Sequence, residues 1–369
     1  MKTKFEEYYP YEEQKYQDLW NNAIFVFDTN VILNLYRYSD ATKSEIIKAI
    51  KDVKERIWLP NKVAQEFQKN RLSVISDQKK IYNDYIKKIQ SIGTEFKNKN
   101  RNPFLSEKLS CSFSDILNKV KTELNKQEKF YEQLIVNDTI HIEIAEIFNG
   151  KVGDNFSDDI LNDLYKKGKQ RFGKKIPPGF KDLNKPEPDR YGDLVVWFQI
   201  IEKAKELKKD IIVIIDDRKE DWWLIHSGKT ISPHPELLKE FNISTEKSCY
   251  IYKPFQFLEF LNKYSKNNYK KEAITEIKDF KLFTKKSKVL NQQVIEVVVL
   301  AKKSKNNLLR FVELLKNAGY QITYKELTNN EYQLIIHISE IPDLERRFKD
   351  KYLNLLIQYE LELKDYKII

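Results

Sequence analysis

Short apolar runs alternate with amphipathic stretches through the first two thirds of the chain. Such runs lie at 23–27, 56–60, 210–215 and 249–252. Their length and their β-branched and aromatic residues favour strands buried on both faces. The apolar residues between them recur with helical spacing. Strands that alternate with helices predict a three-layer α/β fold, in which helices cover both faces of a parallel sheet.

A long helical insertion separates the second predicted strand from the third. It covers about 71–183, and most of it has helical periodicity. Helix starts are predicted at Ser114 and Ser157, because Ser followed by Asp is typical of a helix N-terminus. Four prolines between 177 and 188 then predict an irregular loop, and a new helix is expected near Tyr191.

The pattern changes in the last third of the chain. Residues 263–290 are rich in lysine and predict a charged linker or a solvated helix. From 291 to 369 the expected order is strand, helix, strand, strand, helix, strand, which is the ferredoxin-like βαββαβ plan. We therefore predict an α/β domain over 1–262, a linker over 263–290 and an α+β ferredoxin-like domain over 291–369.

The role of the C-terminal domain stays open at this point. Tyr320, Tyr324 and Tyr332 lie on or beside its middle strands, but 332–339 lacks the Gly-bearing motif of an RNA-recognition sheet. Homo-oligomer formation, binding of a protein partner and small-ligand sensing explain this domain at least as well as RNA binding does.

Composition excludes several classes of protein. The apolar runs are much shorter than the roughly 20 residues of a membrane span, and the N-terminus lacks the apolar core of a signal peptide. Two cysteines and four histidines provide no disulfide framework and no zinc spacing. We therefore expect a cytoplasmic globular protein. The net charge of +10 fits a nucleic-acid partner or, equally, a lysine-rich surface that aids solubility.

Four acidic residues lie where predicted strands end or helices begin. Asp28 and Asp217 follow strands, whereas Glu66 and Asp193 lie in the first turns of helices. Because ligand sites of parallel sheets lie at the carboxyl ends of the strands, we expect these side chains to meet. Clustered carboxylates repel one another unless a cation lies between them, and hard oxygen ligands suit Mg²⁺ or Mn²⁺. Each acid alone is explained as well by a turn or a helix cap.

Four segments resemble PIN-domain nucleases. FVFDTNVILNLYR at 25–37 is similar to the opening motif of that family. IPPGFKD at 176–182, YGDLVVW at 191–197 and DDRKEDWW at 216–223 resemble, in this order, its bacterial PIN-like branch with a large helical insertion. The resemblance covers roughly 20–262. One departure is the distance in sequence from Glu66 to Asp193, which is far longer than in the small PIN toxins.

The resemblance implies a catalytic site and a substrate. Asp28, Glu66, Asp193 and Asp217 match the ligands of a Mg²⁺ or Mn²⁺ site, and Asp221 matches a further acid of the catalytic set. The implied activity is metal-dependent hydrolysis of nucleic-acid phosphodiesters by an activated water, with RNA favoured over single-stranded or structured DNA. A toxin, a phage-defence effector and an RNA-processing enzyme all fit this description. The alternative is a catalytically inactive nucleic-acid-binding or regulatory protein.

Several other residues are weaker candidates. We expect Asn30 to orient Asp28, and Lys175 and Lys181 to flank the proline-rich loop as phosphate contacts. Lys69 and Arg71 follow Glu66 on the predicted helix and begin a net basic segment, which is either one wall of a nucleic-acid groove or a solvated helical brace. If the third strand remains extended to its end, Asp216 points away from Asp217 and is the weaker ligand candidate. Trp222 and Trp223 are expected to pack in the core.

Overall fold

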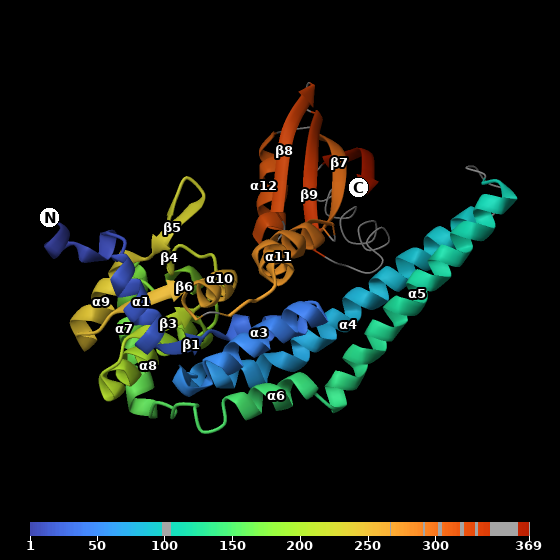
Figure 1. Cartoon of the computed structure of the whole chain (residues 1–369). Helices are drawn as coiled ribbons and strands as arrows, with labels where there is room; N and C mark the ends of the chain where they lie inside the picture. The colour runs from blue at the N-terminus through green and yellow to red at the C-terminus, as the bar shows by residue number, and fades with distance from the viewer. Residues whose placement is uncertain are drawn as a thin grey trace. The chain divides into compact units, whose positions relative to one another are not determined.

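The computed structural model describes residues 1–97, 105–265, 267–290, 292–301, 305–317, 321–328, 331–339 and 361–368. They form two compact units, Met1–Lys278 and Asp279–Ile369 (Figure 1). The boundary between the units falls inside the segment 263–290. No helix in the described part of the chain combines the length and the apolar character of a membrane span.

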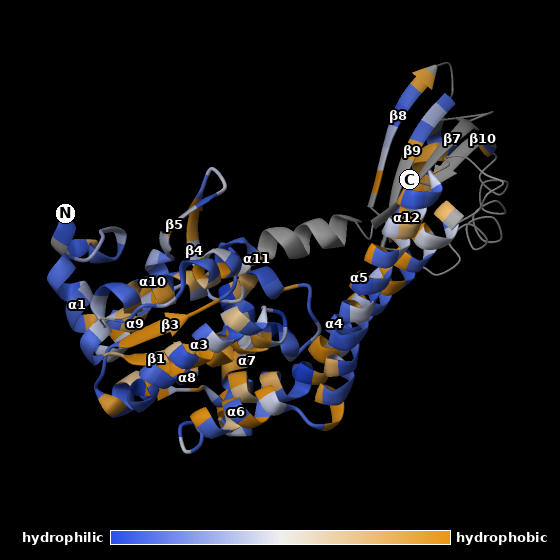
Figure 2. Cartoon of the chain, turned by 45° about the vertical axis from the view of Figure 1, so that its right-hand side comes forward, coloured by the Kyte–Doolittle hydropathy of each residue, from blue (hydrophilic) through white to orange (hydrophobic). Residues whose placement is uncertain are grey.

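A four-stranded parallel sheet is the centre of the first unit, as predicted. Its strands are β1 (Ile24–Phe27), β2 (Ile57–Trp58), β3 (Ile211–Ile214) and β6 (Cys249–Tyr252), in the order β2-β1-β3-β6. In the register, Val26 pairs with both Trp58 and Val213. The central strands β1 and β3 are apolar along their length (Figure 2), because helices cover both faces and leave no solvated side.

Two groups of helices cover this sheet. One group contains α1 (Glu13–Asn22), α3 (Asp40–Asp52) and α10 (Pro254–Tyr264), and the other contains α4 (Asn61–Lys97), α8 (Gly192–Leu207) and α9 (Pro235–Thr245). Phe25 and Phe27 share one face of β1 and contact Phe257 of α10, at ring-centroid distances of 5.7 and 5.4 Å. Val26 points to the opposite face, since side chains alternate along a strand.

The insertion is built on a pair of long helices, α4 and α5 (Glu107–Val136), which pack along each other (Figure 1). They are followed by α6 (Thr139–Ile147) and α7 (Asp158–Gly173). The helix start predicted at Ser157 is confirmed, because its hydroxyl accepts a hydrogen bond from the amide of Ile160. The start predicted at Ser114 is wrong, because Ser106 caps α5 and Ser114 lies inside the helix.

The first unit also contains a short helix, a hairpin and the beginning of a longer helix. The short helix α2 (Thr29–Leu33) follows β1, and the two-stranded hairpin of β4 (Trp223–His226) and β5 (Lys229–Pro233) was not predicted. Part of the predicted linker is the helix α11 (Lys271–Leu290). Its Glu276 accepts hydrogen bonds from the amide and hydroxyl of Ser39 and from the hydroxyl of Thr42, so the first turns of α11 belong to the first unit.

The second unit has an antiparallel sheet in the order β10-β7-β9-β8. The strands are β7 (Gln292–Ala301), β8 (Gln321–Thr328), β9 (Glu331–Ser339) and β10 (Leu361–Ile368), and α12 (Lys305–Asn317) buries Leu308, Phe311 and Leu315. The second helix and the hairpin turn of the βαββαβ plan, expected at 341–352 and 329–330, lie outside the described residues. The ferredoxin-like assignment therefore stays a prediction.

Candidate metal centre

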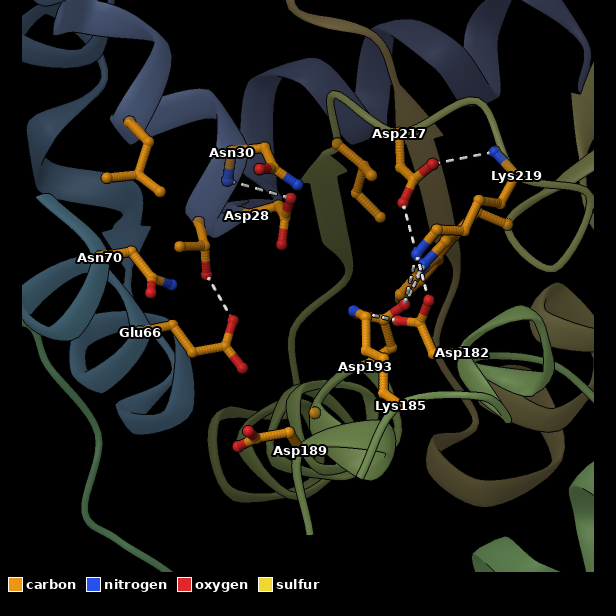
Figure 3. Close-up of a pocket in the computed structure, with 15 residues that line it drawn as sticks. Asp28, Asn30, Glu66, Asn70, Asp182, Lys185, Asp189, Asp193, Asp217 and Lys219 are labelled. Carbon is orange, nitrogen blue, oxygen red and sulfur yellow. Dashed lines mark hydrogen bonds and ion pairs between the residues drawn. The ribbon is translucent and has the colours of Figure 1, made fainter. Parts of the chain in front are cut away.

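A polar pocket of about 180 Å³ lies where β1 and β3 end. The backbone amide of Asp28 donates a hydrogen bond to the carbonyl of Ile214, at 2.9 Å, and so aligns the two strand ends. All four acids that the sequence analysis selected line this pocket (Figure 3). The full lining is Asp28, Thr29, Asn30, Leu33, Glu66, Asn70, Asp182, Lys185, Asp189, Gly192, Asp193, Ile215, Asp217, Lys219 and Trp222.

Asp28 is held by the turn that follows it. Its carboxylate caps α2 and accepts a hydrogen bond from the amide of Asn30, at 3.2 Å. Burial, together with the nearby carboxylates of Glu66 and Asp217, raises the pKa of Asp28 from 3.8 to about 6, although the hydrogen bond from Asn30 opposes the rise. The Asp-Thr-Asn sequence thus directs a carboxylate into an environment that disfavours its negative charge.

Glu66 reaches the pocket from α4. Its carboxylate accepts a hydrogen bond from the hydroxyl of Thr29 at 3.1 Å and pairs with Lys62 at 3.3 Å. At Gly192, the first residue of α8, a Cβ atom would lie 2.8 Å from Oε1 of Glu66. The missing side chain at Gly192 therefore leaves room for Glu66 beside the start of α8.

Asp193 enters from the first turn of α8. Nε1 of Trp222 donates a hydrogen bond to Oδ2 of Asp193 at 3.3 Å. Burial raises the pKa of Asp193 to about 7, although the positive charge of Lys219 opposes the rise. Trp222 is buried and packs edge-on against Trp197, so this tryptophan both fills the core, as expected, and orients an acid of the pocket.

Asp217 and Lys219 form a charged cluster with Asp182. Oδ1 of Asp217 accepts a hydrogen bond from the backbone amide of Lys219 at 2.9 Å, and Oδ2 lies 3.1 Å from its ammonium. The same ammonium lies 2.9 Å from Asp182 and 3.9 Å from Asp193. The second oxygen of Asp182 pairs with Lys185 at 2.7 Å. Burial opposes the charge of Lys219, but the carboxylates of Asp193 and Asp217 raise its pKa overall.

Asp221 does not line the pocket. It is fully buried, and one of its oxygens accepts hydrogen bonds from the backbone amides of Gly179 and Lys181, at 3.2 and 3.1 Å. Gly179 has a positive φ of 93°, and a Cβ atom there would lie 3.5 Å from Cβ of Asp193. Asp221 therefore holds the proline-rich loop against Asp193, and its contribution to the site is indirect.

Asp216 points away from the pocket and accepts a hydrogen bond from the side-chain amide of Asn34. Of the weaker candidates, only Asn30 lines the pocket. Lys69 is 70% exposed and lies 3.6 Å from Asp189, which does line it. Lys175 is exposed, and Lys181 pairs with Glu220 at 2.5 Å.

Arg71 is engaged away from the pocket. Its guanidinium pairs at 2.9 Å with Asp138, which is buried and also accepts a hydrogen bond from the hydroxyl of Tyr36. Arg71 thus connects α4 to the start of α6. This contact favours the helical brace over the nucleic-acid groove for Arg71.

Sequence reasoning missed five of the charged or amide side chains that line the pocket. Asp182 and Lys219 lie inside the segments 176–182 and 216–223, so their place in those motifs was the available signal. Asn70, one turn after Glu66 on α4, had a similar signal in its helical spacing. No pattern marked Lys185 or Asp189, which enter from the irregular loop.

The donor set of the pocket fits a hard divalent cation. Six carboxylates and two lysines line it, which leaves a formal excess of 6 − 2 = 4 negative charges. All the acidic donors are oxygens, which Mg²⁺ and Mn²⁺ prefer. As placed, no three His, Cys, Asp or Glu side chains in the described ranges are close enough together to hold a metal ion. The ammonium of Lys219 lies among three of these carboxylates.

Comparison with known families places the chain. The model of a family described as a PIN-like domain matches residues 24–237. The chain belongs to this PIN-like family. The match contains β1, β2 and β3 of the parallel sheet and every acid of the pocket, whereas β6 lies beyond it. PIN domains are generally nucleases that act on nucleic acid and typically use divalent metal ions. Comparisons with curated proteins and with solved structures give no significant match.

Proposed function

We propose that this PIN-like protein is a nuclease that uses Mg²⁺ or Mn²⁺, held by Asp28, Glu66, Asp193 and Asp217, to hydrolyse phosphodiesters, with RNA as the preferred substrate. One observation carries the proposal: four acids from four separate elements line one pocket at the ends of β1 and β3. Membership of a family of nucleases supports the same activity.

The electrostatics of the pocket supports a bound cation. Asp28 and Asp193 have pKa values raised to about 6 and about 7, because their ionised forms lack sufficient compensation from the protein. A divalent cation between them would favour both ionised carboxylates. When bound, such an ion acts as a Lewis acid on a phosphodiester and increases the acidity of a coordinated water.

The protein supplies orientation. The amide of Asn30 fixes Asp28, the hydroxyl of Thr29 fixes Glu66, and the indole of Trp222 fixes Asp193. Each partner is a neutral donor, so it restricts the carboxylate without removing its charge, and the carboxylate can still bind a cation. Lys69 and Lys185 lie beside the carboxylates and provide positive charge for the phosphates that flank a scissile bond.

The direct test is cleavage of labelled RNA, single-stranded DNA and hairpin DNA in Mg²⁺, in Mn²⁺ and with a chelator. We expect metal-dependent cleavage, fastest with RNA, that Asp28→Asn abolishes. Asp18→Asn is the matched control, because Asp18 is an exposed residue of α1. Equal cleavage by a folded Asp28→Asn protein would overturn the assignment. Metal-dependent binding without cleavage of any substrate would favour the inactive binding protein instead.

A further inference from the structure

Lys219 is the only cation in the described part of the chain whose ammonium contacts three carboxylates of the pocket. Its Nζ lies 2.9 Å from Asp182, 3.1 Å from Asp217 and 3.9 Å from Asp193. Figure 3 shows these groups together on one side of the pocket, with Asp28 and Glu66 on the other. The protein therefore places a positive charge of its own in one half of the pocket.

The turn that carries Lys219 is anchored at several points. The backbone amide of Lys219 donates to Asp217, Nε1 of Trp223 donates to the carbonyl of Asp217 at 2.7 Å, and Trp222 and Trp223 are buried. Two residues after Lys219, Asp221 accepts hydrogen bonds from the amides of Gly179 and Lys181, which anchor this end of the turn to the proline-rich loop. An anchored backbone of this kind holds the base of the lysine in place, so that only its four-carbon stem can move.

The half of the pocket around Lys219 has few oxygens left for a metal ion. Lys185 and Lys219 use one oxygen each of Asp182, and Lys219 uses both oxygens of Asp217, through its amide and its ammonium. Two-metal sites separate their ions by about 4 Å, and each ion needs several oxygen ligands around it. A second divalent ion placed between Asp182 and Asp217 would occupy the position of the ammonium.

We propose that Lys219 takes the place of a second metal ion, so that the pocket binds one divalent cation, on the side of Asp28 and Glu66. This inference rests on the proposed function. Asp193 and Asp217 lie between the two positive charges. The ammonium of Lys219 then faces the substrate phosphate. It supplies the positive charge that a second metal ion would otherwise supply there.

The test counts bound Mn²⁺ ions per chain by calorimetry and by electron paramagnetic resonance, in the full-length protein. We expect one ion in the wild type and two in Lys219→Met, where the vacated carboxylates accept the second. Lys219→Arg keeps the positive charge and should bind one. Lys185→Met is the matched control: it removes a lysine from the same Asp182 but leaves the contacts of Lys219 with Asp193 and Asp217, and should also bind one.

A second readout follows the folding stability of the same variants. In chelator, Lys219→Met should have a lower midpoint of thermal unfolding than the wild type, because Asp182, Asp193 and Asp217 lose the ammonium that they share. Mn²⁺ should raise that midpoint more in Lys219→Met than in the wild type, since a ligand that binds only the folded state stabilises it.

The outcomes separate the two proposals. Two ions in the wild type would overturn the role of Lys219 and leave the nuclease assignment intact, and this count needs no variant to fold. One ion in a folded Lys219→Met protein, with wild-type affinity, would overturn it equally. No Mn²⁺ binding by the wild type at saturating concentration, together with no cleavage, would overturn the proposed function itself.

Discussion

The buried carboxylate of Asp221 accepts a hydrogen bond from the backbone amide of Gly179, which lies 42 residues earlier in the chain, at 3.2 Å. Through this contact and the one to the amide of Lys181, the turn after β3 holds the proline-rich loop beside Asp193. Trp222, the next residue, bonds to Asp193 directly. The segments 176–182, 191–197 and 216–223 thus pack together around the pocket, although other residues separate them in the sequence.

Asp221→Ala should lower the free energy of unfolding by about 2 kcal/mol or more, because the amides of Gly179 and Lys181 lose their buried acceptor. Asp221→Asn keeps an oxygen acceptor at the same position and should lower it less. Urea denaturation at pH 7 measures both values. Both variants should also bind Mn²⁺ more weakly, because a loosened loop lets Asp193 move. The loss of affinity should be larger in the variant that moves Asp193 further. Equal stability of Asp221→Ala and the wild type would show that Asp221 does not anchor the loop.

Two neighbouring aspartates provide a matched pair for the site. Asp217 lines the pocket, whereas Asp216 bonds to Asn34. Asp217→Asn should reduce the cleavage rate by roughly 10²-fold or more, since loss of about 3 kcal/mol of transition-state stabilisation corresponds to that factor. Asp216→Asn should have a much smaller effect. Single-turnover cleavage rates of the two variants test this order, and the reverse order would place the ligand on the other side of the strand end.

The raised pKa values of Asp28 and Asp193, about 6 and about 7, predict a pH dependence of metal-free stability. In the folded state these groups keep their protons to higher pH than in the unfolded chain, where the ordinary value is 3.8. The free energy of unfolding of the metal-free protein should therefore fall as the pH rises from about 4 to about 7, because the folded state loses these protons.

Asp193→Asn mimics the protonated form of this residue and removes the part of the pH dependence that comes from Asp193. Its thermal midpoint in chelator should exceed that of the wild type by more at pH 7.5 than at pH 5, as measured by calorimetry. Saturating Mn²⁺ should stabilise the wild type more than the variant at pH 7.5. A constant difference between variant and wild type across this range would contradict the raised pKa of Asp193.

Lys69 and Arg71 should behave differently when neutralised. Lys69→Gln removes an exposed charge beside Asp189, so it should weaken RNA binding and reduce the salt slope by about 0.7 to 0.9 log units, one phosphate contact. Arg71→Gln leaves the buried carboxylate of Asp138 without its positively charged partner and should destabilise the fold by roughly 3 kcal/mol. Fluorescence anisotropy between low and moderate salt measures the first effect, with exposed Lys263→Gln as the control. If Lys69→Gln has the same salt slope as the wild type, the groove is excluded at this residue and the helical brace is the remaining interpretation.

Local pattern predicted the sheet and selected the four acids that line the pocket, whereas their assignment as metal ligands came from the resemblance to PIN-domain nucleases. Uninterrupted apolar runs marked the strands, and a parallel sheet brings the residues at their carboxyl ends together, so Asp28 and Asp217 could be selected before their contacts were known. Glu66 and Asp193 followed from the starts of the adjacent helices.

Contacts between distant segments could not be predicted in this way. The partner of Arg71 lies 67 residues later in the chain. Asp182, which pairs with Lys219, and the amides that bond to Asp221 lie in a loop whose path no periodicity describes. The start of α5 was misplaced because Ser and Asp at 114–115 resemble a helix cap, while the amphipathic pattern of the helix continues through them.

Titration calorimetry of Mn²⁺ into the metal-free protein tests most directly whether this pocket is a metal centre. The wild type should bind the ion with measurable heat, and Glu66→Gln and Asp193→Asn, each shown to be folded by circular dichroism, should weaken the affinity by about tenfold or more, because each removes one anionic donor. Wild-type protein that binds no Mn²⁺, or folded variants that bind it as tightly as the wild type, would contradict the account.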